Sequence, residues 1–277
     1  RMRTRYQGRS YDLYLLSDHG NTPSVPFSWE VGRSLGRFIL HQLGEQLSLD
    51  EVFGQVGYTL AKTQYLLDDL RTVSQRLPTG LRRVLKAMWR YVGRLIPTDR
   101  ELEPYDMERR EDVVVRASGP LAHVYFNVTR RALDLIEVAV LYPRLLDQLL
   151  DTEAIGLVVG RVGEHVVALG PDGGATTISA NARKVVGSDP VAIFGDPEWV
   201  AGEIRRVVSF PHSGDLVLLA RMDPGGRTVT FEEQEATHGG VGGPQGEPFI
   251  AFPPEIDISP LSSPEDLHSL FWNRYRA

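Results

Sequence analysis

The order of apolar and polar residues alternates between strand-like and helix-like patterns along the chain. Residues 11–16 (Tyr-Asp-Leu-Tyr-Leu-Leu) are mostly apolar or aromatic and stop abruptly at Ser17-Asp18-His19-Gly20. This pattern predicts a buried strand that runs into a polar loop. In open α/β sheets, ligands bind at the carboxyl ends of the strands. Residues 17–20 are therefore the first candidates for a functional site.

The next segment has a helical pattern. Apolar residues recur every three or four positions through most of residues 29–112, with arginines between them. Proline-containing turns at residues 78–80 and 97–98 interrupt the pattern. We expect residues 29–112 to form a helical insertion or cap, and residues 1–28 together with 113–277 to form the core.

The remainder of the chain mixes both patterns, which predicts an α/β fold. Asp196-Pro197 and Ser263-Pro264 each combine an N-cap residue with proline at the first helical position. Strands are expected at residues 113–116, 124–127, 157–159, 165–169, 176–178, 216–220, 228–231 and 248–252, and helices at 131–150, 196–208 and 263–275.

Composition narrows the classes of function. A net charge of −6 disfavours binding to nucleic-acid phosphates, so we expect no nucleic-acid partner. The chain has no cysteine, so any metal ion must be held by Asp, Glu or His. No run reaches the roughly eighteen apolar residues of a membrane span. Because the chain begins at Arg1 without a signal-peptide pattern, we expect it to start inside a longer protein.

Three histidine-containing segments are candidates for chemistry. Asp18 and His19 combine a carboxylate with an imidazole, a ligand set for zinc or manganese, and Gly20 lets the backbone turn so that both side chains converge. The alternative is a turn-capping Asp18 beside a surface histidine. His238 lies in a glycine-dense loop that would let the main chain approach a ligand, or that would simply be a flexible surface loop. His123 would contact a substrate phosphate, or would be a half-buried structural residue.

The first two motifs, in this order within an α/β sequence, resemble the alkaline phosphatase superfamily. Ser17-Asp18-His19-Gly20 is similar to the Asp-His metal pair of that superfamily, and His238-Gly239-Gly240 to its last histidine ligand. With Asp189-Pro190, Gly214-Asp215-Leu216 and Gln245, the chain also resembles bacterial phosphatase-like proteins often described with a membrane or phage-holin segment. The resemblance covers about residues 11–27 and 113–277.

The resemblance implies a partial alkaline-phosphatase-like α/β/α sandwich with a helical insertion. It implies two divalent ions, zinc or manganese, with Asp18 and His19 on one ion and His238 on the other. It places a Thr or Ser nucleophile and the remaining ligands N-terminal to Arg1, so whether this chain alone is active stays open. The implied activity is that of a phosphatase or phosphodiesterase acting on a small-molecule or lipid-linked phosphate ester, with a membrane anchor elsewhere in the bacterial parent protein. The alternative is a non-catalytic module that binds a partner through its helical cap.

Overall fold

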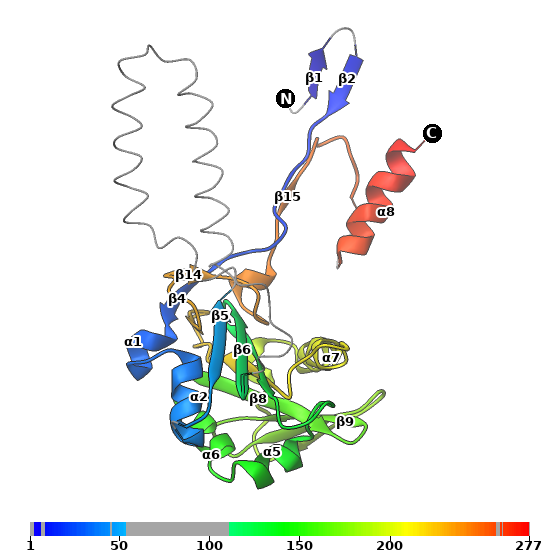
Figure 1. Cartoon of the computed structure of the whole chain (residues 1–277). Helices are drawn as coiled ribbons and strands as arrows, with labels where there is room; N and C mark the ends of the chain where they lie inside the picture. Colours follow the sequence, from blue (N-terminus) through cyan, green and yellow to red (C-terminus); the bar gives the residue numbers. More distant parts are fainter. Residues whose placement is uncertain are drawn as a thin grey trace, which may run out of the picture. The chain divides into compact units, whose positions relative to one another are not determined.

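A computed structural model describes residues 3–6, 9–44, 46–53, 111–258, 261 and 263–276. The chain divides into two compact units, both shown in Figure 1. The terminal unit contains Arg1–Gly20 and Glu247–Ala277, and the central unit contains Asn21–Gly246.

The central unit is built on an eight-stranded mixed sheet in the order β11-β10-β9-β8-β12-β7-β6-β5. Neighbouring strands are antiparallel except β5 and β6, which are parallel. The chain is therefore a mixed α/β protein. The strands are β5 (Leu49–Phe53), β6 (Val113–Ser118), β7 (Leu121–Phe126), β8 (Ile155–Val162), β9 (His165–Leu169), β10 (Ala175–Ile178), β11 (Arg183–Val186) and β12 (Leu216–Ala220).

Helices cover both faces of this sheet. All residues of β12 are buried, as expected for a strand that is covered on both sides. Leu216 and Leu218 belong to one hydrophobic core, whereas Val217 and Leu219 belong to the other. The first core includes α2 (Leu35–Leu43), α5 (Leu135–Leu141) and α6 (Leu145–Leu150), and the second includes α7 (Pro197–Val208) and the short 3-10 helix η1 (Ala192–Phe194).

A second, three-stranded sheet of the central unit joins distant parts of the chain. Its order is β13 (Thr228–Thr230), β4 (Thr22–Pro26) and β14 (Ala236–Thr237), with β4 parallel to β13 and antiparallel to β14. Helix α1 (Phe27–Val31) follows β4 directly. The Phe27 ring is buried 5.7 Å from the Phe231 ring, which ties this sheet to the first hydrophobic core.

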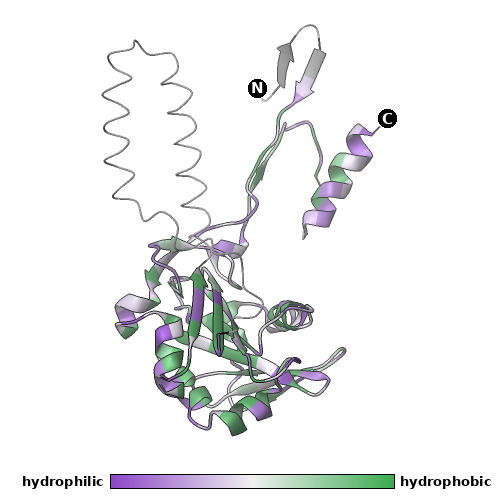
Figure 2. Ribbon diagram, in the orientation of Figure 1, coloured by the Kyte–Doolittle hydropathy of each residue, from purple (hydrophilic) through white to green (hydrophobic). Residues whose placement is uncertain are grey.

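The terminal unit consists of short elements. Strands β1 (Arg3–Tyr6) and β2 (Arg9–Asp12) form a hairpin, β3 (Leu15–Leu16) pairs with β15 (Ile250–Ala251), and α8 (Pro264–Tyr275) ends the described chain. The Tyr14 ring meets the Phe271 ring of α8 edge-on at 5.0 Å. The Tyr275 hydroxyl donates to Asp12 Oδ2 over 2.8 Å. Figure 2 shows that the segment around β3 and β15 is largely hydrophobic.

Helix α7, helix α8 and the β8–β9–β10 meander confirm the sequence predictions. Asp196 caps α7 and Ser263 caps α8, as expected from the proline that follows each of them. The long helix predicted for residues 131–150 is wrong, because the structure breaks it into α5 and α6. The break falls at Pro143, which has no N–H to donate to a helical hydrogen bond. None of the helices in the described part of the chain has a hydrophobic stretch long enough to cross a lipid bilayer.

Two further expectations need correction. Helix α2 buries Leu35 and Ile39 in the central core, and β5 pairs with β6, so the core extends through residue 53 instead of stopping at residue 28. The rest of the expected insertion, residues 54–110, lies outside the described residues. The strand predicted as buried at residues 11–16 is exposed in the terminal unit, where Leu15 and Leu16 are 51% and 46% exposed.

Candidate metal centre

The Asp18-His19 pair follows directly on the paired strands of the terminal unit. The Ser17 N–H donates to the Phe249 carbonyl oxygen over 3.0 Å, and the Phe249 N–H donates to the Ser17 hydroxyl over 2.9 Å. These two hydrogen bonds extend the β3–β15 pairing by one step. The backbone is therefore held in place immediately before Asp18.

The His19 ring has a defined orientation. Its Nδ1 lies 2.6 Å from the Gly20 carbonyl oxygen. A carbonyl oxygen only accepts hydrogen bonds, so Nδ1 carries the proton, and in the neutral ring Nε2 presents a lone pair. A metal-binding histidine is commonly oriented in this way, with one ring nitrogen bonded to a backbone carbonyl and the other facing the ion.

The neighbouring carboxylate lies close to this lone pair. Asp18 Oδ1 is 3.6 Å from His19 Nε2, and the Asp18 side chain is 88% exposed. Two ligands that each lie about 2 Å from a tetrahedral zinc ion are separated by roughly 3.4 Å. The Asp18 and His19 donors thus have a suitable spacing for one shared ion. Among the described residues no group of three or more Asp, Glu or His side chains is placed to hold a metal ion. The same 3.6 Å contact also suits an ion pair between Asp18 and a protonated His19.

His238 lies in the central unit, directly after β14. Thr237, the last residue of β14, pairs with Thr22, the first residue of β4. Most of the buried polar residues in the described part of the chain lie around this small sheet. The buried polar residues of the sheet and its adjoining loops are Thr22, Ser24, Thr228, Thr230, Glu232, Thr237 and Gln245. Burying a polar group costs free energy unless a hydrogen bond compensates for the lost solvation. Such a cluster therefore indicates that the hydrogen-bond partners around this sheet are precisely positioned.

Glu232 holds the turn that faces the His238 loop. Its carboxylate accepts the backbone N–H of Gly119 over 2.9 Å, and the Gly119 carbonyl accepts the N–H of Phe231 over 2.9 Å. Gly119 lies in the β6–β7 turn with φ +57°. Glu232 is only 6% exposed, and Gln234 donates to the same carboxylate oxygen. The turn is therefore attached to the strand segment that leads toward His238.

The His238 loop is packed against the protein on two sides. A Cβ added to Gly119 would lie 2.1 Å from the His238 carbonyl oxygen, so only glycine fits this contact. Farther along the loop, a Cβ on Gly242 would lie 1.8 Å from the Phe194 carbonyl oxygen. Between these contacts, Gln245 of the 3-10 helix η2 (Pro244–Gly246) accepts the Gly240 N–H over 2.9 Å. The loop following His238 is thus closely fitted to the β6–β7 turn and to η1.

His123 has structural partners of its own. It lies within β7, where its Nδ1 accepts the Gly214 N–H over 3.1 Å, and its ring stacks on Tyr125 at 6.3 Å. Burial lowers the pKa of His123, and the positive charge of Arg161 lowers it further. The residue is therefore a half-buried histidine that anchors the turn before β12. A contact with a substrate phosphate stays a prediction.

The sequence alone does not indicate the role of Glu232 in positioning the β6–β7 turn. It belongs to an acidic stretch in which Glu233 is exposed, and no local pattern distinguishes the two. Its burial depends on the β6–β7 turn, more than one hundred residues earlier in the chain. No protein family, curated protein or solved structure matches this chain.

Proposed function

We propose that this chain is the C-terminal part of a metal-dependent phosphohydrolase domain of the alkaline phosphatase superfamily. The proposal extends the mixed α/β fold to the α/β/α sandwich of that superfamily. Asp18 and His19 bind one divalent ion, zinc or manganese, and His238 binds a second. When bound, a pair of such ions polarises the phosphoryl oxygens of a substrate and stabilises the leaving oxygen.

The geometry of His19 is the observation that carries the proposal. A surface histidine has no need of a fixed ring orientation, whereas the Nδ1 contact with the Gly20 carbonyl directs the Nε2 lone pair toward Asp18. Asp18 Oδ1 also accepts the backbone N–H of His19 over 3.1 Å, which holds the carboxylate beside the ring. A shared cation provides a physical reason for the convergence, because it offsets the charge of the carboxylate and uses the lone pair of the ring.

In this proposal His238 supplies a ligand to the second ion. The resemblance of His238-Gly239-Gly240 to the last histidine ligand of the superfamily supports this role.

In this proposal the nucleophile and the remaining ligands lie N-terminal to Arg1. The substrate would be a small-molecule or lipid-linked phosphate ester, hydrolysed as a mono- or diester.

Two measurements test the proposal. The first is manganese and zinc binding to this chain by titration calorimetry, with Asp18→Ala and His19→Ala as test variants. His165→Ala is the matched control, because His165 is an exposed histidine of β9 in the central unit. We expect each test variant to weaken metal binding by at least about tenfold, because the loss even of a residue that only orients a ligand costs that much, and the control to change nothing.

The second measurement is hydrolysis of p-nitrophenyl phosphate and bis-p-nitrophenyl phosphate by the longest natural protein that contains this chain. We expect manganese- or zinc-dependent turnover that Asp18→Ala reduces by at least about a hundredfold. If the metal-loaded protein cleaves neither ester and Asp18→Ala leaves metal binding unchanged, the phosphohydrolase proposal fails. A non-catalytic binding module would then be the better description.

A further inference from the structure

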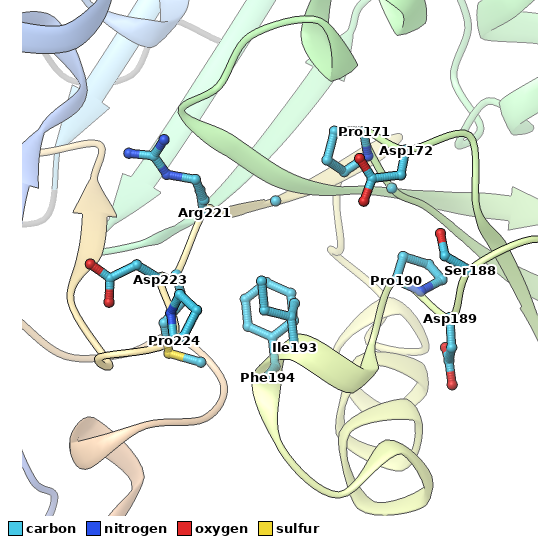
Figure 3. A pocket seen from close by; sticks show the side chains of 13 residues that line it. Pro171, Asp172, Ser188, Asp189, Pro190, Ile193, Phe194, Arg221, Asp223 and Pro224 are labelled. Carbon is cyan, nitrogen blue, oxygen red and sulfur yellow. The ribbon is translucent and has the colours of Figure 1, made fainter.

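A cavity of about 470 Å³ lies in the central unit, outside the candidate metal centre. It is bordered by the β9–β10 turn, by the loop that precedes η1, by η1 itself and by the segment that follows β12 (Figure 3). Its volume is within the range of roughly 300 to 1,000 Å³ that is typical of small-molecule sites.

The walls are largely apolar. Pro171 and Pro190 form one side, and Ile193 and Phe194 lie across from them (Figure 3). Met222 also lines the cavity. Phe194 and Met222 are 3% and 5% exposed, so they form a firm floor, whereas Ile193 is 50% exposed at the opening. A compact apolar group would replace water on these surfaces with favourable contacts.

Two of the charged groups at the rim are already paired. Arg221 Nη2 lies 3.0 Å from Glu30, and its Nη1 lies 3.9 Å from Glu153. Asp189 is bound to Arg183 and accepts the Thr176 hydroxyl over 2.8 Å. In Figure 3 the Arg221 guanidinium and the Asp189 carboxylate both point away from the centre of the cavity. Neither group offers its charge to a ligand in the cavity.

Asp172 differs from these residues. Within the described part of the chain its carboxylate makes no hydrogen bond or ion pair, and in Figure 3 it is turned toward the cavity beside Pro171. The other rim carboxylate, Asp223, points away and accepts the Arg227 N–H over 3.0 Å. The cavity therefore combines apolar walls with one carboxylate that faces it, that of Asp172.

We propose that this cavity binds a small amphipathic cation, an amine attached to a compact apolar body. The apolar body would contact Pro171, Pro190, Ile193 and the Phe194–Met222 floor, and the ammonium group would pair with Asp172. A charge-assisted hydrogen bond of this kind is stronger than a neutral one and sets the class of ligand. An anionic phosphate ester is disfavoured by the same carboxylate, so this site is distinct from the proposed metal centre.

The cavity is largely formed before any ligand arrives. The carbonyl of Phe194 is in close contact with Gly242, in the loop that follows His238. Met222 belongs to the second hydrophobic core. Because packing behind Phe194 and Met222 holds both side chains in place, ligand binding would not require the free energy of opening a cavity.

The test uses three probes of similar size and different charge: benzylamine, benzyl alcohol and phenyl phosphate. Binding is followed by NMR in the whole chain labelled with 13C at the methionine and isoleucine methyl groups. The chain has four methionines, and Met222 and Ile193 both report on the cavity directly. The test variant is Asp172→Asn, because asparagine also suits the exposed Pro171-Asp172-Gly173 turn. The matched control is Asp147→Asn, on the exposed surface of α6.

We expect benzylamine to shift the Met222 and Ile193 methyl signals in a saturable way, and benzyl alcohol to bind more weakly. Asp172→Asn should weaken benzylamine binding about fivefold and abolish the preference over the alcohol, whereas Asp147→Asn should change neither. The proposal is overturned if benzylamine leaves both methyl signals unmoved, or if Asp172→Asn has no effect. It is also overturned if phenyl phosphate binds best, since the cavity would then belong with phosphate-ester recognition. Failure of phosphate-ester hydrolysis would leave this outcome unaffected.

Discussion

Replacing Gly119 by alanine tests how tightly the His238 loop is fitted to the β6–β7 turn. Gly119 has φ +57°, a conformation that costs an L-residue about 1 to 2 kcal/mol. The new Cβ would also lie 2.1 Å from the His238 carbonyl oxygen and 2.7 Å from Thr237 Oγ1. The first of these atoms belongs to the backbone and cannot rotate away, so the loop or the turn must move.

Gly163→Ala provides a matched control for this change. Gly163 lies in the β8–β9 turn with φ +56°, but a Cβ there has no neighbour within 4 Å. Both variants therefore bear a similar backbone strain, and they differ in the steric contact. Overpacking of a close contact costs about 1 to 3 kcal/mol. We expect Gly163→Ala to lose about 1 kcal/mol of unfolding free energy and Gly119→Ala about 3 kcal/mol.

Thermal unfolding followed by circular dichroism measures the difference. For a unit of this size each kcal/mol corresponds to about 2 to 4 °C, so Tm should fall by about 3 °C in the control and about 9 °C in Gly119→Ala. NMR of the histidine rings supplies a local readout, because Gly119→Ala should shift the His238 signals and Gly163→Ala should not. Equal losses of Tm in the two variants, with His238 unmoved, would refute the close packing of the loop.

Two pH-dependent predictions follow from the charges of the central unit. The pKa of Glu137 is lowered to about 2 by its hydrogen bond with Arg131 and by the Asp134 N–H. The stabilisation that Glu137 contributes should therefore be complete above its ordinary pKa of 4.5 and be lost as the pH falls from there toward 2. In Arg131→Ala, a carboxyl 13C NMR titration should show the Glu137 midpoint move up toward the ordinary value. An unchanged midpoint would contradict this pairing. The pKa of His123 is lowered by burial and by the charge of Arg161, so the free energy of unfolding should decrease as the pH drops below the ordinary histidine pKa of 6.5. Arg161→Met should raise the pKa of the His123 ring in a 1H NMR titration. A His123 midpoint at or above 6.5 in the unaltered protein would count against this.

The elements with local signals were predictable from the sequence. The N-caps Asp196 and Ser263 and the apolar alternation of the β8–β9–β10 meander each depend on a few neighbouring residues. Pro143 also carried a local signal, but the apolar residues on either side continued the helical spacing and concealed the break. Strand β5 has the sequence Leu-Asp-Glu-Val-Phe, which lacks the apolar–polar alternation of a strand and matches the helical spacing around it.

The candidate site was predictable only in part, because most of its structure depends on long-range pairing. The Asp18-His19 motif is local, so the sequence alone is enough to suggest it as a candidate. The sheet that precedes His238 joins strands more than two hundred residues apart, and no periodicity predicts such a partner. The burial of Glu232 follows from that sheet and from the β6–β7 turn, so it became visible only in three dimensions.

Paramagnetic broadening by manganese tests the proposed metal centre most directly. Mn²⁺ is added in stoichiometric amounts to the chain, and the ring signals of its seven histidines are followed by 1H NMR. We predict that the His19 and His238 signals broaden first and together, that Asp18→Ala removes the effect at both, and that His165 and His268 stay sharp. Broadening of His19 without His238, or no broadening of either, would contradict a metal centre shared by the two motifs.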